Sequence, residues 1–216
     1  CPYFWPIGNG EDGRHILLFF SHMSGGQYLL GDYDTSRDRF VVTYGGKFNF
    51  GASTPSGVHA PSAAPDGDGG VIVIFNMNPG KPTAGWNQIM TLPRRLTVDG
   101  DVLSIQPAGN VASLRGDHQR REDVELPANT DVVIDGVQGD ALEIIARIAP
   151  SAAPVVELDV LRSPGGEEYT RIAFYRDRGM NESFAGERRR QSLITIDTSR
   201  ASLAADVKPR APETAP

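Results

Sequence analysis

This sequence has a single cysteine, no long apolar run and no excess of positive charge. Cys1 is the only cysteine among 216 residues, so no disulfide can form within the chain and the redox compartment stays open. No apolar run approaches the ~20 residues that a membrane-spanning helix needs. The formal net charge is -6, whereas nucleic acids and anionic membranes favour basic surfaces. We therefore expect neither nucleic acid nor a membrane as a partner.

Metal-binding spacings and a targeting signal are lacking as well. His15, His22 and His118 do not share the spacing of metal ligands, so no metal or other cofactor is expected. Residue 1 is not Met, and nothing near it has the charged-then-apolar pattern of a signal peptide. The chain is therefore expected to be an internal piece of a longer protein.

Short β-rich runs separated by turn residues fill the first half of the chain. The runs cover residues 15–20, 27–33, 40–44, 71–75 and 88–92. Two further runs flank Asp99-Gly100-Asp101, and an Asp-Gly turn between β-rich runs is a strong hairpin signal. Strands at this spacing, without a helical period, predict an all-β meander such as propeller blades or a sandwich.

The second half follows a segment of different character. Residues 107–127 hold a charged cluster without period-2 alternation, which predicts a linker with about one helical turn. Beyond this linker, apolar and polar residues alternate over residues 142–148, 156–160 and 194–197, with a turn at residues 163–166. Strands with one polar face predict an antiparallel β-sandwich.

One stretch is more specific than these patterns: Gly85-Trp86-Asn87-Gln88-Ile89-Met90-Thr91-Leu92-Pro93-Arg94-Arg95-Leu96. It resembles the Gly-Trp to Leu-Pro-Arg pattern of glycoside hydrolase family 32, which includes invertases, levanases and inulinases. Shorter stretches resemble other motifs of that family, in the family's order. These are Cys1-Pro2-Tyr3-Phe4, Gly31-Asp32-Tyr33-Asp34, Val58-His59-Ala60-Pro61-Ser62 and Ile196-Asp197-Thr198-Ser199-Arg200-Ala201-Ser202.

The resemblance implies a fold in which a five-bladed β-propeller is followed by a β-sandwich. Residues 1–106 would then form the C-terminal blades of the catalytic propeller, beginning inside the fourth blade. Residues 107–127 would form the linker, and residues 128–216 an incomplete sandwich.

The resemblance also implies a β-fructofuranosidase-type glycosidase that cleaves sucrose or fructans with retention of configuration. Such enzymes use an Asp nucleophile near the N-terminus, a Glu acid/base in a Glu-Cys-Pro motif and a third, stabilising Asp. On this mapping the Glu precedes Cys1 and both Asp residues lie further upstream, so this chain holds no catalytic residue and alone is expected to be inactive. Asp32, Asp34 and Asp38 are expected to cap turns, because solvated loop carboxylates lack the burial that raises a pKa.

Four residues are candidates for the sugar pocket. Cys1 adjoins the expected acid/base and is alternatively a buried structural thiol. His59 stands where relatives carry Tyr or His, so it is expected either to hydrogen-bond the Glu or a fructosyl hydroxyl or to close a loop. Phe75 and Asn76 fall where many members have a Trp-containing turn; they would stack and hydrogen-bond, or alternatively belong to the strand core.

Two alternatives stay open at this point. One is a non-catalytic carbohydrate-binding or scaffolding β-protein derived from the same family. The other is an arabinanase-like propeller of a neighbouring family, which suits the Gly-Trp to Leu-Pro-Arg stretch less well. The family favours an extracellular or periplasmic location, while the oligomeric state and the choice among sucrose, inulin and levan stay open.

Overall fold

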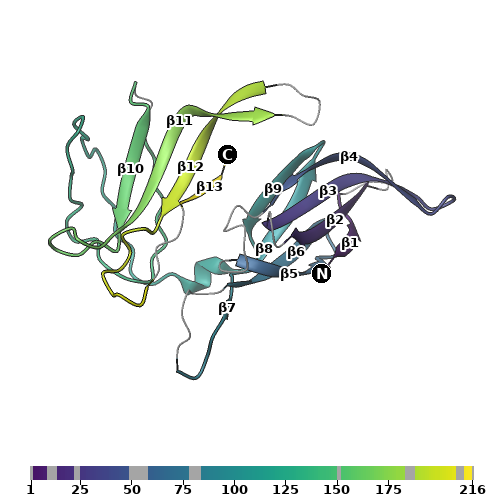
Figure 1. Cartoon of the computed structure of the whole chain (residues 1–216), viewed down its shortest axis with the longest axis horizontal. Helices are drawn as coiled ribbons and strands as arrows, with labels where there is room; N and C mark the ends of the chain where they lie inside the picture. Colours follow the sequence, from purple (N-terminus) through teal and green to yellow (C-terminus); the bar gives the residue numbers. More distant parts are fainter. Residues whose placement is uncertain are drawn as a thin grey trace.

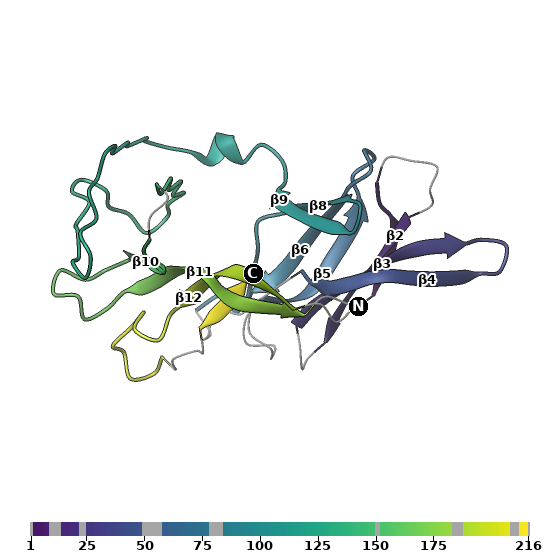
Figure 2. The ribbon, with the colours of Figure 1, turned by 90° about the horizontal axis from the view of Figure 1, so that it is seen from above.

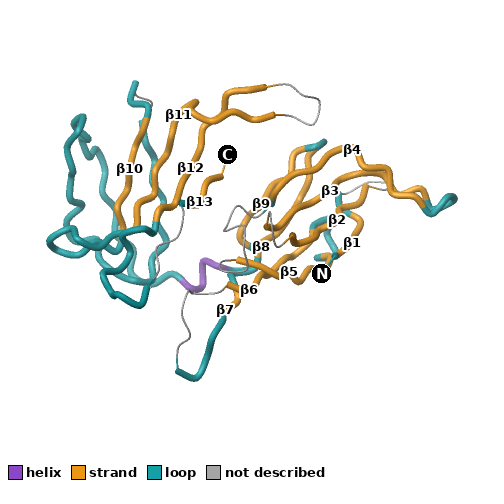
Figure 3. Tube along the Cα trace, in the orientation of Figure 1, coloured by secondary structure: helices purple, strands orange, loops and turns teal. Residues whose placement is uncertain are grey.

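The computed structural model describes residues 2–8, 14–21, 25–48, 58–77, 84–149, 152–182, 188–207 and 212–215. Within these ranges the protein is all-β, as the sequence pattern predicts, with three antiparallel sheets. The only helical element among them is a 3₁₀ turn, η1, over Val111–Leu114, which Figure 3 shows between the strands of the two halves. No helix in the described part of the chain has the length and apolar character needed to cross a membrane.

The first sheet is a four-stranded meander in which each strand pairs with the next along the chain. Its strands are β1 (Tyr3–Pro6), β2 (Arg14–Ser21), β3 (Gly25–Asp34) and β4 (Arg39–Lys47). The turn between β3 and β4 forms because the Asp34 carboxylate accepts the backbone N–H of Ser36 at 2.9 Å. Asp38 closes this turn with a positive φ of 52°, a conformation that Asp tolerates better than most residues.

The second sheet is built in the same way from the next part of the chain. It orders β5 (Val58–Pro65), β6 (Val71–Met77), β8 (Arg94–Asp99) and β9 (Val102–Pro107), and the short β7 (Ile89–Met90) also pairs with β6. The expected Asp-Gly hairpin joins β8 to β9, with Gly100 at a φ of 58°. Glycine occupies this position because the turn requires a left-handed backbone conformation there.

A shared apolar core holds the first two sheets together. Ile16, Leu18 and Leu30 of the first sheet and Val71, Val73 and Leu96 of the second are all fully buried. They are inward-facing members of period-2 strands, so the sheets pack face to face as neighbouring propeller blades do. Figure 1 shows β5 lying beside the strands of the first sheet. Burial raises the pKa of the core residue Tyr28 to about 12, so its hydroxyl stays neutral.

Polar ties reinforce this packing at the edge of the core. Arg14 on β2 donates to Asp101 Oδ1 at 2.6 Å and to Thr43 Oγ1 at 3.1 Å, and it also contacts the carbonyl oxygen of Gly100. The backbone N–H of Gly8 donates to the carbonyl of Gly69 at 2.7 Å. The Arg14 side chain therefore holds the β8–β9 hairpin against the first sheet. A backbone hydrogen bond holds the loop between β5 and β6 to the residue that follows β1 and Ile7.

The third sheet belongs to the second half of the chain. Its strands are β10 (Val155–Val160), β11 (Thr170–Glu182), β12 (Arg188–Asp197) and β13 (Glu213–Ala215), paired in that order. Figure 1 shows this sheet apart from the first two, and Figure 2 shows the long strandless segment after η1 running in a wide arc on the β10 side before it enters β10. The described part of residues 108–154 holds no strand and only the 3₁₀ turn η1. That residues 107–127 form a linker between two domains stays a prediction.

One predicted strand is wrong. Residues 142–148 alternate apolar and polar side chains, yet they form no strand and Leu142, Ile144 and Ile148 are exposed. Alternation specifies which face of a strand is apolar, but a strand also needs a neighbour to accept its backbone hydrogen bonds. The segment is instead tied to the linker by an ion pair in which Arg115 Nη2 donates to Glu143 Oε1 at 2.8 Å.

Candidate functional site

His59 and Asn76 face each other at one end of the second sheet. His59 follows the first residue of β5 and Asn76 precedes the last residue of β6, and the two are partners in the strand register. A β-bulge interrupts the pairing between His59 and Ser62, with Ala60 at a φ of 47° and Pro61 buried. Bulges turn side chains away from the direction of a regular strand, and they recur beside functional sites. The structure thus brings two of the four sequence candidates together.

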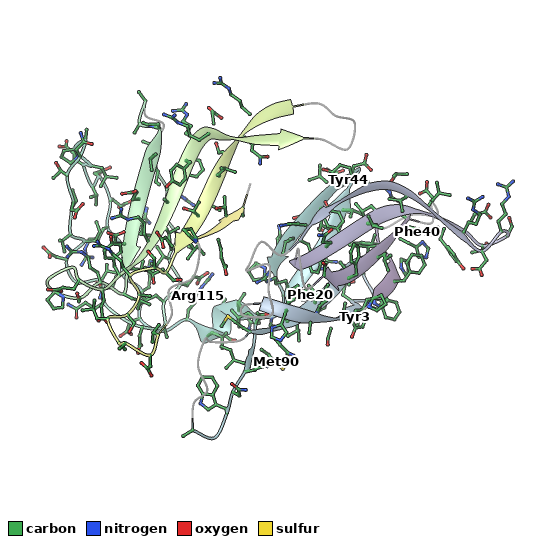
Figure 4. All side chains as sticks on the ribbon, viewed as in Figure 1. Tyr3, Phe20, Phe40, Tyr44, Met90 and Arg115 are labelled. Carbon is green, nitrogen blue, oxygen red and sulfur yellow. The ribbon has the colours of Figure 1, made fainter. Side chains whose placement is uncertain are left out.

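Phe20 belongs to the same site, although sequence reasoning did not single it out. Its ring lies 6.3 Å from the His59 ring, centroid to centroid, and is tilted by 58°. Phe20 is near the C-terminal end of β2, which is antiparallel to β1, so it lies at the end where β1 begins with Tyr3. Figure 4 shows Phe20 and Tyr3 near each other on this side of the sheets. The signal available in the sequence was its position. Phe20 is the last residue of the apolar run 15–20, and side chains at the end of a strand are seldom fully enclosed by the core.

Cys1 lies outside the described residues. Among the residues that are described, Tyr3 begins β1 at the end of the first sheet where Phe20 lies. The place of Cys1 next to the acid/base stays a prediction.

Phe75 is inside the core of the first two sheets. Its side chain is 1% exposed, and its ring lies 5.3 Å from the ring of Phe48. The Arg94 guanidinium lies 5.2 Å from the Phe75 ring centroid, and Thr91 Oγ1 accepts the Phe75 backbone N–H at 3.1 Å. Stacking of Phe75 on a sugar stays a prediction, and it would require this buried ring to become accessible.

Arg94 connects the core to the start of the linker. Burial lowers the pKa of its half-buried guanidinium from the ordinary value, and the Phe75 ring compensates part of the lost hydration by a cation–π contact. Arg94 pairs with Pro107 across β8 and β9, and the Ala108 N–H donates to the Pro93 carbonyl at 2.9 Å. The Leu-Pro-Arg stretch therefore joins the start of β8 to the end of β9 at one end of the second sheet.

The Asp cluster of the first sheet has the properties of turn residues. Asp34 accepts hydrogen bonds from Ser36 Oγ at 2.6 Å and from the backbone N–H groups of Ser36 and Arg37. Led by the Ser36 hydroxyl, these bonds lower the pKa of Asp34. Asp38 accepts the hydroxyl of Tyr33. A general acid needs a raised pKa, so Asp34 is suited to capping its turn rather than to donating a proton.

The side chains at the His59 site offer hydrogen-bonding groups and an aromatic surface, and none of them is a carboxyl group. An imidazole and an amide supply both donors and acceptors, and Phe20 supplies an aromatic surface beside them. Neither His59 nor Asn76 is a carboxylate, so glycoside hydrolysis there would need two carboxyl groups from elsewhere. Within the ranges that the structure describes, no group of three or more His, Cys, Asp and Glu side chains is placed to hold a metal ion.

Comparison with known proteins shows similarity at the level of the fold. No family model matches the sequence, and no curated protein matches it. Among solved structures, the chain is similar to the glycoside hydrolase family 32 β-fructofuranosidase of Bombyx mori, with a TM-score of 0.52 and 17% sequence identity over 91% of this chain. A mutant of that enzyme in complex with sucrose gives a TM-score of 0.51 and 18% identity over the same share. In both cases this chain spans 44% of the enzyme's length. At such identities the likeness shows a fold like that of these glycoside hydrolases, with part of a propeller and a sandwich.

Proposed function

We propose that this chain is the C-terminal part of a glycosidase that cleaves β-fructofuranosidic bonds of sucrose or fructans. The observation that carries the proposal is the order of its sheets. Two antiparallel meanders share one core like neighbouring blades, a strandless linker follows, and a further antiparallel sheet comes last. The proposal is also supported by the similarity of fold to the Bombyx mori β-fructofuranosidase and by the family-like stretches that begin at Cys1.

The proposed reaction is a retaining double displacement. It requires a nucleophilic carboxylate and an acid/base carboxyl only ~5 Å apart, so that the first attacks the sugar directly. The resemblance assigns the acid/base to a Glu immediately before Cys1 and the nucleophile to an Asp further upstream. The 216-residue chain then contributes one wall of the sugar pocket and neither catalytic carboxyl.

Cys1, His59, Phe75 and Asn76 are proposed to border the sugar. His59 and Asn76 are supported by their opposed positions in the strand register and by the contact of His59 with Phe20, near the start of β1. An imidazole there would hydrogen-bond the acid/base or a fructosyl hydroxyl, and the Asn76 amide would bind a second hydroxyl. Phe20 adds an apolar surface against which His59 is oriented.

The test uses the coding sequence upstream of Cys1 together with an activity assay. We expect a Trp-Glu pair directly before Cys1, and Asn-Asp-Pro and Arg-Asp-Pro stretches before that. The extended protein should release fructose from sucrose, inulin or levan, and the 216-residue chain should release none above background because it lacks both carboxyls. Fructose release by the purified 216-residue chain would refute the mapping of Cys1. An upstream sequence without these stretches would favour the non-catalytic carbohydrate-binding alternative.

A further inference from the structure

A cavity of about 240 Å³ opens on one face of the third sheet. The strand register explains its shape. Arg171 pairs with Asp197, and Tyr175 pairs with Leu193, on either side of a row of small residues. That row is Ala173, Thr195 and Thr214, contributed by β11, β12 and β13. Because the middle side chains are short and the flanking ones are long, a depression forms between the rows.

A bulge in β11 adds a further wall to the cavity. The register between β11 and β12 shifts between Tyr175 and Gly179, and Asp177 takes a φ of 50°. The bulge sets Arg178 against the cavity that the regular strand residues line. The extra residues of a bulge commonly re-aim a side chain in this way.

Two of the three charged residues that line the cavity, Arg171 and Asp197, are held in position by neighbouring groups. Arg171 donates to both Asp159 oxygens at 2.8 and 2.9 Å, contacts Glu157 at 3.2 Å, and lies 5.1 Å from the Tyr169 ring centroid. These carboxylates, led by the hydrogen bond to Asp159, raise the pKa of Arg171. A guanidinium has five N–H groups, and these three contacts do not use all of them. Asp197 accepts the Ser199 N–H at 2.8 Å, which lowers its pKa and keeps it ionised.

This combination favours a neutral polyhydroxyl ligand. Arg171 and Asp197 supply a charged donor and a charged acceptor, and Thr195 and Thr214 supply hydroxyls that do both. Glu157 and Asp159 compensate the charge of Arg171, and Asp197 lines the cavity together with Arg178, so these groups give the cavity no net positive charge.

Shape and apolar surface agree with this chemistry. Tyr175 gives the cavity an aromatic wall, the usual apolar component of a small-molecule site. The cavity volume is below the ~300–1,000 Å³ of sites for drug-sized ligands, so a single ring fits better than an oligomer.

We propose that this face of β11–β13 is a sugar-binding site that takes one neutral monosaccharide unit, separate from the site at His59. Its existence does not depend on the catalytic proposal, because its residues come from the second half of the chain alone. In a protein acting on a carbohydrate chain, such a site would hold a second part of the same polymer.

The experiment is a residue-resolved NMR titration of the isotope-labelled 216-residue chain with D-fructose, D-glucose and, in a separate series, inorganic phosphate. We expect sugar-dependent amide shifts at Tyr175, Thr195 and Thr214. Tyr175→Ala should raise the Kd about fivefold, equivalent to about 1 kcal/mol. Thr195→Val, which keeps the shape but removes a hydroxyl, should raise it about threefold. His59→Ala is the matched control and should leave these shifts unchanged.

The other outcomes overturn the proposal. They are sugar shifts confined to the surroundings of His59, shifts produced by phosphate and not by either sugar, and an absence of shifts at a large molar excess of sugar. If Tyr175→Ala fails to fold, the isosteric Thr195→Val and the exposed Arg178→Gln decide: an unchanged Kd in both refutes the site. Loss of fructose release by the extended protein would bear on the catalytic proposal without affecting this one.

Discussion

Replacement of Phe75 separates a packing role from a sugar-binding role. The ring is 1% exposed, lies 5.3 Å from Phe48 and carries the Arg94 guanidinium at 5.2 Å. Phe75→Ala removes the buried ring and leaves a cavity, which costs ~3–5 kcal/mol in protein cores. Of this, ~0.5–1.5 kcal/mol belongs to the aromatic pair and ~0.5–2 kcal/mol to the cation–π contact of a half-buried Arg94. Phe75→Leu keeps most of the volume and should cost about 1–2 kcal/mol.

The assay is urea unfolding of each variant, followed by near-ultraviolet circular dichroism, with fructose release by the extended protein as the second readout. If Phe75 is core, activity at a temperature where the protein is folded should be nearly unchanged in Phe75→Leu. A Phe75→Ala variant that loses less than ~1 kcal/mol of unfolding free energy would refute the packing argument. A Phe75→Leu variant that unfolds at nearly the wild-type urea concentration but loses more than about tenfold in kcat/KM would show that the ring contacts the sugar.

Three further predictions concern the same sheets. In the extended protein His59→Ala should lower turnover ~100-fold or more if the imidazole assists the acid/base. If His59 only closes a loop, turnover should fall less than about threefold and the protein should lose ~1 kcal/mol of stability. Kinetics and thermal unfolding of this one variant distinguish the two roles. Hydrogen bonds from the Asp68 N–H and then from Arg95 lower the pKa of Asp66, so its contribution to stability is present above its unfolded pKa of ~3.9 and is lost as pH falls through the lower folded pKa. Asp66→Asn should flatten the stability profile below about pH 4, and an unchanged acid limb would contradict this. Residues 1–106 expressed alone should aggregate, because exposed strand edges and an apolar face template association, whereas a sharp thermal transition with dispersed amide signals would show that they are an independent domain.

Local signals predicted the hairpins of this fold well. Asp99-Gly100 specifies a left-handed position between two β-rich runs, and β8 and β9 pair around it as expected. Asp34 likewise identifies the β3–β4 turn, because its carboxylate bonds the backbone two residues on. Such features depend on neighbouring residues only, so the sequence contains all the information they need.

Features that depend on distant partners were predicted less well. The period-2 pattern of residues 142–148 describes a strand, but the pattern cannot supply the neighbouring strand, and the structure has none there. Phe20 was read as part of an apolar run, because only the approach of β5 brings His59 to its ring. The cavity of the third sheet was missed for the same reason, since Tyr175, Thr195 and Thr214 become neighbours only through the register of β11, β12 and β13.

The two faces of the first sheet show how burial bears on the proposed fold. Its inner face carries Ile16, Leu18 and Leu30 against the second sheet. Its outer face carries an aromatic cluster in which the Phe4 ring stacks on His15 at 4.9 Å and meets Tyr33 and Phe40 edge-on at 5.4 and 5.0 Å. Phe4 is 37% exposed, whereas a sheet with one solvated face carries polar side chains there. A sheet that is apolar on both faces is typical of a middle layer, so this cluster supports the proposal that β1–β4 is one blade of a larger propeller, with a further blade packed against this face.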